Sequence, residues 1–338
     1  MSKTEEIFSV GIDIGTTTTS LVLSKLTIKN VASGFVVPKI EIVDKTVIYR
    51  SDVHFTPLVD DTTIDFGGIE QIVRGEYERA RVNPEEIKTG AVIITGDTAR
   101  KENAESVLSA ISRMAGSFVV ATAGPHLEAY IAGLGSGAAA FSAKNHALVA
   151  NADIGGGTTN ISVFDDGKLV ATMCADIGGR LIRFESRTGR VTGYISGGEV
   201  TAGHCNINLA RGQSLSLPEI RQISDALAGS LVSILKGRPD ALARKLAIGP
   251  LPENIQPEYL LFSGGVGRLI YDDEDCDDIK NLTRFGDLGP ALAQSVRRAM
   301  AKEAFKLFKP DETIYATVIG AGVHTTELSG STIYISDS

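Results

Sequence analysis

Residues 11–23 of the chain read GIDIGTTTTSLVL, and residues 152–164 read ADIGGGTTNISVF. In both stretches an apolar run enters an Asp-Ile-Gly turn, a stretch rich in Thr or Gly follows, and alternating apolar residues resume. This alternation predicts β-strands, so we expect each copy to be a β-hairpin with glycines and hydroxyls at its tip. The spacing between the copies far exceeds the period of about 20 to 50 residues that marks solenoid repeats. It therefore indicates two related domains.

The composition is that of a globular protein that has room for two hydrophobic cores. The chain has 338 residues, of which 43% are hydrophobic and 22% are charged. Its formal net charge of −8 argues against nucleic acid as a partner. The three cysteines have no C-x-x-C spacing, and neither a signal peptide nor a run of about 18 apolar residues is visible. We expect a soluble cytoplasmic protein without a membrane partner.

The apolar spacing outside the two hairpins predicts an α/β protein with a first domain over residues 1–135 and a second over residues 136–338. The helices expected from this spacing cover residues 67–81, 99–115, 126–134, 217–235 and 289–308. The strands expected from it cover residues 90–96, 118–121, 147–154, 159–165, 168–175, 259–263 and 316–320.

The two hairpin tips have the composition of phosphate-binding loops. Glycines let consecutive backbone N–H groups approach one anion, and threonine hydroxyls add further donors. The residues expected to bind phosphate are Gly15, Thr16, Thr17 and Thr18 in the first copy and Gly155, Gly156, Gly157, Thr158 and Thr159 in the second. Asp13 and Asp153 would repel phosphate directly, so we assign both to Mg²⁺, bound through its water shell. The alternative is that both loops are only tight hairpin turns.

Three other glycine clusters leave alternatives open. Gly264 and Gly265 follow a predicted strand, where they suit either an adenosine contact or a plain strand-to-helix turn. Gly320 closes the last predicted strand and is assigned to the nucleotide, the alternative being tight packing at a domain junction. The glycines around Gly133 fit a hinge and close helix packing equally well.

Signatures of other chemistries are missing from the sequence. It contains no G-x-x-x-x-G-K-[ST] loop, no G-x-G-x-x-G after the first strand and no G-x-S-x-G elbow. The five histidines show no metal-binding spacing. No catalytic residue can be assigned from these patterns.

Five sequence motifs occur in an order that is typical of a known protein superfamily. They are DIGTTTT (13–19), AGPHLEAYIAGLGSG (123–137), DIGGGTTN (153–160), FSGGVG (262–267) and VIGAG (318–322). This order resembles the actin/Hsp70/sugar-kinase superfamily, as its first phosphate loop, first connecting helix, second phosphate loop, adenosine loop and second connecting helix. The resemblance implies two duplicated actin-like (ribonuclease H-like) domains with a nucleotide cleft between them, and ATP and Mg²⁺ as ligands.

Within that superfamily, AGPHLEAYIAGLGSG, SGGVGRLIYDD and RFGDLGPALA are most similar to the ethanolamine ammonia-lyase reactivating family (EutA family). That resemblance implies a chaperone-like ATPase whose partner is ethanolamine ammonia-lyase, and which promotes the exchange of damaged cobalamin for adenosylcobalamin. It also implies an ethanolamine-utilisation setting, often a bacterial microcompartment.

Two features depart from the family patterns. The Hsp70 relatives carry a Glu before the Pro of the first connecting helix, whereas here Gly124 precedes Pro125, and Glu128 one turn later cannot be placed at the γ-phosphate. The family usually continues beyond VIGAG, so we expect a short variant or a truncated chain.

Two other functions remain open for this fold. A small-molecule kinase would need a carboxylate to deprotonate an acceptor hydroxyl, for which Asp97 is a candidate. Asp97 is equally suited to be the N-cap of the helix expected from Ala99 onward. The other alternative is a filament or scaffold protein that binds ATP without using it in catalysis.

Overall fold

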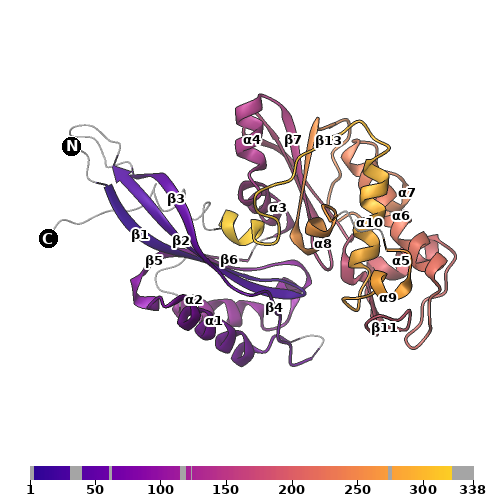
Figure 1. Ribbon diagram of the computed structural model, residues 1–338, viewed down its shortest axis with the longest axis horizontal. Coiled ribbons are helices and arrows are strands. Elements are labelled where there is room, and N and C mark those ends of the chain that lie inside the picture. The colour runs from indigo at the N-terminus through magenta and orange to yellow at the C-terminus, as the bar shows by residue number, and fades with distance from the viewer. Residues whose placement is uncertain are drawn as a thin grey trace. The chain divides into compact units, whose positions relative to one another are not determined.

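The computed structural model describes residues 4–30, 40–60, 63–114, 119–122, 124–272 and 276–321. The chain forms two compact units, shown in Figure 1. Unit 1 consists of Met1–Gly124 with Thr317–Ser338, and unit 2 of Pro125–Ala316. The division therefore falls at Gly124/Pro125 and not at the expected 135/136, and the C-terminal residues belong with unit 1. Each unit is described by itself.

Unit 1 is built on a mixed sheet with the strand order β3-β2-β1-β5-β6, to which β4 adds by pairing with β2. The first three strands are antiparallel neighbours, whereas β1, β5 and β6 run parallel. The strands are β1 (Thr4–Ile14), β2 (Thr18–Asn30), β3 (Ile40–Arg50), β4 (His54–Phe55), β5 (Ile87–Ile94) and β6 (Val119–Thr122).

Two helices, α1 (Phe66–Ala80) and α2 (Ala104–Met114), close the core of unit 1 on one face of this sheet (Figure 1). Alternate residues of β1, among them Ile12, are fully buried against apolar positions of α1 and α2 such as Ile69 and Ile111. The side chain of Asp65 starts α1 by accepting a hydrogen bond from the backbone N–H of Gly68. Short 3₁₀ turns, η1 (Pro84–Glu86) and η2 (Gly96–Arg100), flank β5.

Unit 2 repeats the topology of unit 1. Its sheet has the order β9-β8-β7-β12-β13, in which the first three strands are antiparallel neighbours and the last three run parallel. The strands are β7 (Leu148–Ile154), β8 (Thr159–Asp165), β9 (Lys168–Ala175), β12 (Tyr259–Ser263) and β13 (Lys306–Leu307). Each expected hairpin is present, as β1–β2 and β7–β8, so the internal echo of the sequence corresponds to a duplicated fold.

The helices of unit 2 pack on the two faces of this sheet. On one face, α3 (Pro125–Gly135) and α4 (Ala138–Asn145) cover residues such as Val149 and Phe164. The other face carries the larger core, which includes α6 (Leu217–Leu235) and α10 (Gly289–Met300). The remaining elements are η3 (Gly179–Leu181), the β10 (Ile182–Phe184) and β11 (Val191–Tyr194) hairpin, α5 (Ser196–His204), α7 (Ala241–Leu246), α8 (Gly264–Leu269) and α9 (Ile279–Leu282).

The bounds of α6 agree with the sequence prediction because its start is encoded locally. Ser216 and Glu219 form a reciprocal capping box, and Pro218 lies in the first turn. The apolar spacing then buries one face of the helix, including Ile223, Leu227 and Leu231.

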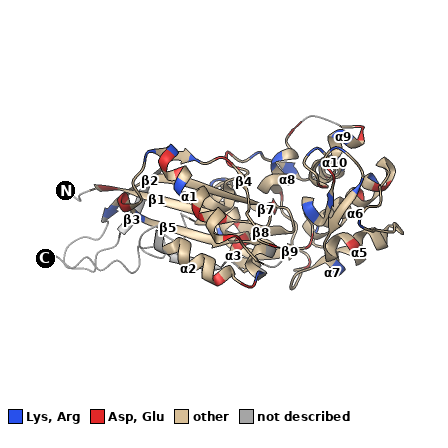
Figure 2. Cartoon of the chain, turned by 90° about the horizontal axis from the view of Figure 1, so that it is seen from below, with Lys and Arg blue, Asp and Glu red and all other residues tan. Residues whose placement is uncertain are grey.

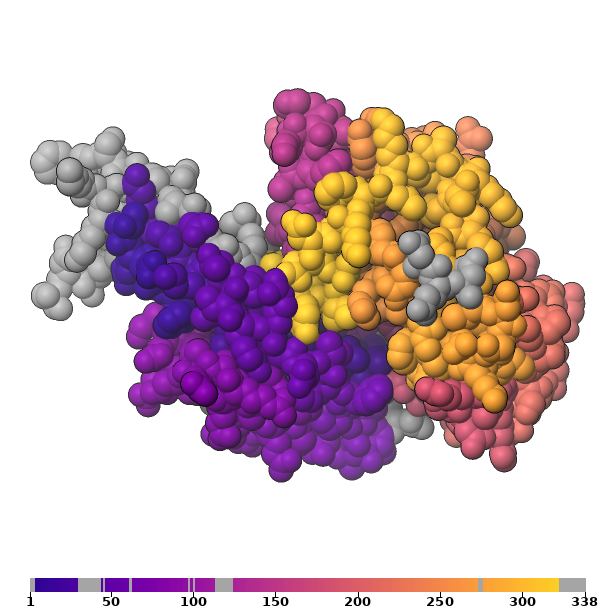
Figure 3. All heavy atoms as spheres, viewed as in Figure 1, coloured from indigo at the N-terminus to yellow at the C-terminus, as the bar shows by residue number. Residues whose placement is uncertain are grey.

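Three expected elements are wrong. The helix expected over 289–308 ends at Met300, and residues 306–308 instead run along β12, where the N–H groups of Lys306 and Phe308 donate to Glu258 and Leu260 (yellow beside orange in Figure 3). The strand expected over 316–320 is helical, because a short buried apolar run cannot by itself distinguish the two structures. The helix expected from residue 99 begins at Ala104. Asp97 lies in η2, so it is not the N-cap of that helix.

Close packing of two glycines explains where the units divide. A Cβ atom on Gly133 of α3 would lie 2.3 Å from Ser162 Oγ and 2.5 Å from Phe164 Cε2, so α3 belongs to unit 2. A Cβ atom on Gly11 of β1 would lie 2.4 Å from the carbonyl oxygen of Val318, so the helical residues 317–321 belong to unit 1. Close packing is therefore the role that the structure supports for Gly133.

Replacing Gly133 with alanine should destabilise unit 2, because the new methyl group would overlap β8. We expect Gly133→Ala to lower the free energy of unfolding by about 1–3 kcal/mol. Gly229→Ala in α6 is the matched control, since its Cβ would meet nothing within 4 Å. That control should raise stability by up to about 1 kcal/mol. Denaturant unfolding measures both variants, and equal behaviour would contradict the packing argument.

Candidate phosphate-binding loops

The first loop, between β1 and β2, is held by the backbone carbonyl of Gly15. The N–H of Gly15 closes the turn by donating to the carbonyl of Thr18 (2.9 Å). The carbonyl of Gly15 accepts hydrogen bonds from the hydroxyls of Thr56 (2.7 Å) and Thr98 (3.0 Å). We call the hydrogen bonds that hold this carbonyl the clamp of the loop. Because a trans peptide points its C=O and N–H in opposite directions, the N–H of Thr16 points away from the clamp.

Thr56 follows β4, and a buried carboxylate holds that strand. Glu76 of α1 is 1% exposed and accepts hydrogen bonds from Tyr49 Oη (2.5 Å) and His54 Nε2 (2.8 Å). Burial by itself would raise the pKa of Glu76, but these hydrogen bonds and the charge of Arg79 hold it below its ordinary value. The ionised Glu76 thus fixes the strand that delivers Thr56 to the loop.

Two further threonines of the first loop have distinct surroundings. The hydroxyl of Thr17 is buried and has no hydrogen-bond partner among the described residues. Thr16 lies against Gly96, whose φ of 61° and missing side chain leave room for its hydroxyl, since a Cβ there would lie 2.4 Å from Thr16 Oγ1. Both hydroxyls are thus packed into the loop.

The second loop, between β7 and β8, repeats the turn but is clamped by backbone amides. The N–H of Gly155 donates to the carbonyl of Thr158 (3.0 Å). The carbonyls of Gly155 and Gly156 accept from the N–H groups of Gly179 (3.0 Å) and Arg180 (2.6 Å). The N–H groups of Gly156 and Gly157 therefore both point away from residues 179–180. Successive amides turned to one side form the concave arrangement that binds anions.

Two residues of the second loop region serve its packing. A Cβ on Gly178 would lie 2.4 Å from the carbonyl oxygen of Gly156, so residues 178–180 can approach the loop only with glycine at that position. Thr159 is fully buried, and its hydroxyl donates to the carbonyl of Ile177 (2.7 Å). The Thr159 hydroxyl, expected to bind phosphate, instead holds the neighbouring segment against the hairpin.

Each leading aspartate accepts a hydrogen bond from a hydroxyl at the carboxyl end of the adjacent parallel strand, where Thr95 follows β5 and Ser263 ends β12. Thr95 Oγ1 donates to Asp13 Oδ1 (2.9 Å), and Ser263 Oγ donates to Asp153 Oδ2 (3.0 Å). Among the described residues, no three His, Cys, Asp or Glu side chains gather as a metal site. One carboxylate per loop suits a cation held mainly by water and phosphate oxygens, which is how Mg²⁺ is usually bound.

The other glycines assigned to the nucleotide lie in two places. Gly264 and Gly265 begin α8 directly after β12, and a Cβ on Gly264 would lie 2.5 Å from Asp153 Oδ1. Gly264 therefore adjoins the second loop, whereas nothing lies within 4 Å of a Cβ on Gly265. Gly320 is buried in the helical residues that follow Ala316, and so does not close a strand.

Comparison with known proteins identifies the family. The family model "Ethanolamine utilisation protein EutA" matches residues 5–338. The ethanolamine ammonia-lyase reactivase EutA of Salmonella typhimurium strain LT2 is 37% identical over 336 residues, which are 99% of this chain and 71% of that protein. The reactivase of the same name from Escherichia coli K12 is 38% identical over 334 residues, 98% of this chain and 70% of that protein. The chain belongs to the EutA family.

Solved structures support the fold of this EutA family member. A Ppx/GppA family protein of Aquifex aeolicus superposes with a TM-score of 0.54 at 14% identity, covering 98% of this chain and all of that one. The type II variant of the Aquifex aeolicus Ppx/GppA phosphatase gives a TM-score of 0.51 at 13% identity, with 95% and 99% covered. At such identities the likeness establishes the actin-like ATPase fold alone.

Arg180 and Asp287, which the sequence analysis did not select, adjoin the second loop. The N–H of Leu288 donates to the carbonyl of Gly179 (2.7 Å), and the N–H of Gly289 donates to Asp287 Oδ1 (2.8 Å). Burial raises the pKa of Asp287 to about 6, although the Gly289 amide and the charge of Arg180 oppose the shift. The RFGDLGPALA motif contains Asp287, but its role depends on contacts distant in sequence.

The structure does not identify a catalytic base at Gly124, at Asp97 or among the histidines with a described contact. Gly124 is exposed, and a Cβ there would meet nothing within 4 Å. The side chain of Asp97 is outside the described part of the chain. Three of the histidines make local contacts, His54 with Glu76, His126 with Thr172 and His146 with Asp166.

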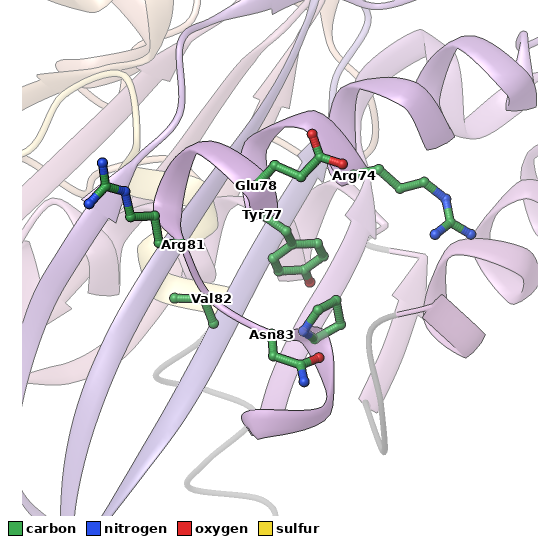
Figure 4. Close-up of a pocket in the computed structure, with 7 residues that line it drawn as sticks. Arg74, Tyr77, Glu78, Arg81, Val82 and Asn83 are labelled. Atoms are coloured by element: carbon green, nitrogen blue, oxygen red, sulfur yellow. The ribbon is translucent and has the colours of Figure 1, made fainter.

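A surface pocket of about 390 Å³ lies elsewhere on unit 1 (Figure 4). Its lining comes from the end of α1 and from residues 81–84, which precede the start of β5. The first loop is next to the opposite end of β5, so this pocket is no part of the candidate site. Figure 2 shows Lys and Arg interspersed with Asp and Glu on the helices rather than gathered by sign. Within the described ranges, no helix could cross a lipid bilayer.

Replacing Asp287 with asparagine should stabilise the protein at neutral pH. A carboxyl whose folded-state pKa is raised costs stability as the pH rises from 3.8 through about 6, and the cost is complete above pH 6. We expect Asp287→Asn to increase the free energy of unfolding by about 1–3 kcal/mol at pH 7 and to have no effect near pH 4. The exposed Asp311→Asn is the control. A pH-independent effect in unfolding experiments would contradict the assignment.

Proposed function

We propose that this chain binds ATP with Mg²⁺ through its two hairpin loops and uses the nucleotide to reactivate ethanolamine ammonia-lyase. The observation that carries the nucleotide part is the clamp on the first glycine of each loop. In both units the carbonyl of that glycine is hydrogen-bonded inside the protein, by hydroxyls at Gly15 and by an amide at Gly155. The next amide in each loop is thereby directed outward, toward an anion.

The residues beside each loop fit a magnesium-bound triphosphate better than a bare anion. Each loop begins with an aspartate, and a carboxylate next to a phosphate requires a cation between them. The buried Thr17 hydroxyl offers a further donor in the first loop. Mg²⁺, when bound, would neutralise phosphate charge and keep most of its water shell. The chain's own part is to orient both carboxylates and present the amides of Thr16, Gly156 and Gly157.

Family membership supports the choice of partner. The two curated relatives are named ethanolamine ammonia-lyase reactivases, and each aligns with nearly all of this chain. ATP can change a partner enzyme only if the ATP-bound and ATP-free states differ in their affinity for that enzyme. We propose that this difference drives the exchange of damaged cobalamin in the lyase for adenosylcobalamin. The microcompartment setting remains a prediction.

Removing either aspartate charge should weaken magnesium-dependent nucleotide binding. We expect Asp13→Asn and Asp153→Asn each to lower the affinity for ATP with Mg²⁺ about tenfold or more, while ATP binding in EDTA does not weaken, since the removed charge repels phosphate when no cation is present. Asp44→Asn and Asp165→Asn remove exposed aspartates from the same sheets and serve as controls. Isothermal titration calorimetry measures all four, and wild-type affinity in both loop variants would remove the nucleotide proposal.

A version of this protein as long as its curated relatives, of which this chain covers 71% and 70%, should restore a lyase inactivated with hydroxocobalamin. Recovery of ammonia-lyase activity is expected only when ATP, Mg²⁺ and free adenosylcobalamin are present together, because the exchange needs both an energy source and a replacement cofactor. Asp153→Asn should be inactive in this assay and Asp165→Asn active. No recovery above the minus-ATP control would refute the reactivase proposal.

Experiments on the purified protein also distinguish the two alternative functions, a small-molecule kinase and a filament or scaffold protein. ATP turnover without an added metabolite argues against a kinase, which needs an acceptor hydroxyl. Sedimentation that increases steeply with protein concentration in ATP would favour a filament or scaffold protein.

A further inference from the structure

The duplicated topology places a hydroxyl followed by glycine at equivalent strand ends. In each unit a strand from later in the sequence runs parallel to the strand that enters the loop, as β5 beside β1 and β12 beside β7. Thr95-Gly96 follows β5, and Ser263-Gly264 ends β12 and begins α8. Both glycines have a left-handed backbone, with φ of 61° and 82°. The two hydroxyls differ in register, because Ser263 pairs directly with Asp153, whereas Thr95 lies two residues beyond Ile93, which pairs with Asp13.

Both hydroxyls contact the aspartate that begins the neighbouring loop. Thr95 Oγ1 lies 2.9 Å from Asp13 Oδ1, and Ser263 Oγ lies 3.0 Å from Asp153 Oδ2. The glycine after each hydroxyl gives space to a side chain of the loop. That side chain is Thr16 beside Gly96 and Asp153 itself beside Gly264.

In unit 2 the direction of the hydroxyl proton is fixed. Asn151 Nδ2 lies 2.9 Å from Ser263 Oγ, and both residues are fully buried. An amide NH₂ group can only donate, so Ser263 Oγ accepts from Asn151, and its single proton is left for Asp153. The Asn151–Ser263–Asp153 chain thus holds one carboxylate oxygen in a defined orientation.

We propose that Thr95 and Ser263 are positioning residues that orient Asp13 and Asp153 for the magnesium-bound nucleotide. This inference rests on the proposed function, since the aspartates act there through the cation. A carboxylate that swings freely must be ordered when the cation binds, whereas one already held by a hydroxyl is preorganised. The two hydroxyls therefore affect the metal-dependent part of nucleotide affinity and not the contacts of the loop amides.

The test compares nucleotide affinity with Mg²⁺ and in EDTA, by calorimetry. Thr95→Val and Ser263→Ala should weaken ADP or ATP binding in Mg²⁺ about tenfold or more and leave affinity in EDTA unchanged. Thr95→Ser keeps the hydroxyl and should restore wild-type behaviour. Ser263→Cys, with a weaker donor of similar size, should be intermediate and remains usable if Ser263→Ala does not fold.

Two matched controls remove buried hydroxyls that do not contact an aspartate in the described structure. Thr89→Val acts at the opposite end of β5 from Thr95, and Ser162→Ala acts on β8, where the hydroxyl has no hydrogen-bond partner. Both should retain the wild-type response to Mg²⁺. Thermal unfolding without nucleotide checks that every variant is folded.

The results that would contradict the positioning role differ from those that would contradict nucleotide binding. If Thr95→Val and Ser263→Ala keep the wild-type Mg²⁺ response, the positioning role is wrong and the nucleotide proposal stands. The positioning role is equally wrong if affinity falls by the same factor in Mg²⁺ and in EDTA. A wild-type chain whose nucleotide binding ignores Mg²⁺ would overturn both proposals.

Discussion

The carbonyl of the first glycine in each hairpin loop has to be hydrogen-bonded on the inner side if the following amide is to face outward, because the trans peptide fixes the two groups in opposition. A buried carbonyl without a partner would cost about 1–3 kcal/mol. Unit 1 meets this constraint with the hydroxyls of Thr56 and Thr98, and unit 2 with the backbone amide of Gly179. The surrounding elements, β4, η2 and residues 176–180, are arranged around these contacts.

A second constraint is that the helical segment after each sheet must approach a strand closely, which requires a glycine at the contact. The helix after β6 packs on the sheet of unit 2 through Gly133, and the helical residues after β13 pack on the sheet of unit 1 against Gly11. The chain therefore passes between the units twice, and each unit is completed by residues that follow the last strand of the other. The hydrophobic pattern alone cannot predict this domain boundary. It shows that α3 and residues 316–321 are apolar, but not which of the two units each segment packs against.

The parts of the fold that were predictable are those whose signal is local. The hairpins β1–β2 and β7–β8 have apolar runs on both sides of a glycine-rich turn, and α6 carries its capping box and proline within four residues. The end of α10 was not predictable, because residues 301–308 have good helical composition and leave the helix only by pairing with β12. The same limit applies to the site. Gly15 and Gly155 stand out in the sequence, but Thr56, Thr98 and Gly179 reach them from distant segments that share no pattern.

The two clamps also differ in what a mutation can remove. The unit 1 clamp consists of side chains, so one substitution at Thr56 or Thr98 deletes a hydrogen bond without moving the backbone. In unit 2 the clamp consists of main-chain amides, which no side-chain substitution deletes. Its sensitive position is Gly178, where any side chain would push the segment away from the loop, whereas a side chain on Gly179 would meet Gly289 and Val266. Asp153 is 8% exposed and is held by a buried serine and asparagine, which adds to the rigidity of the second loop. The second loop is therefore the more preorganised of the two, and the first is the one whose geometry depends on β4 and its support by Glu76.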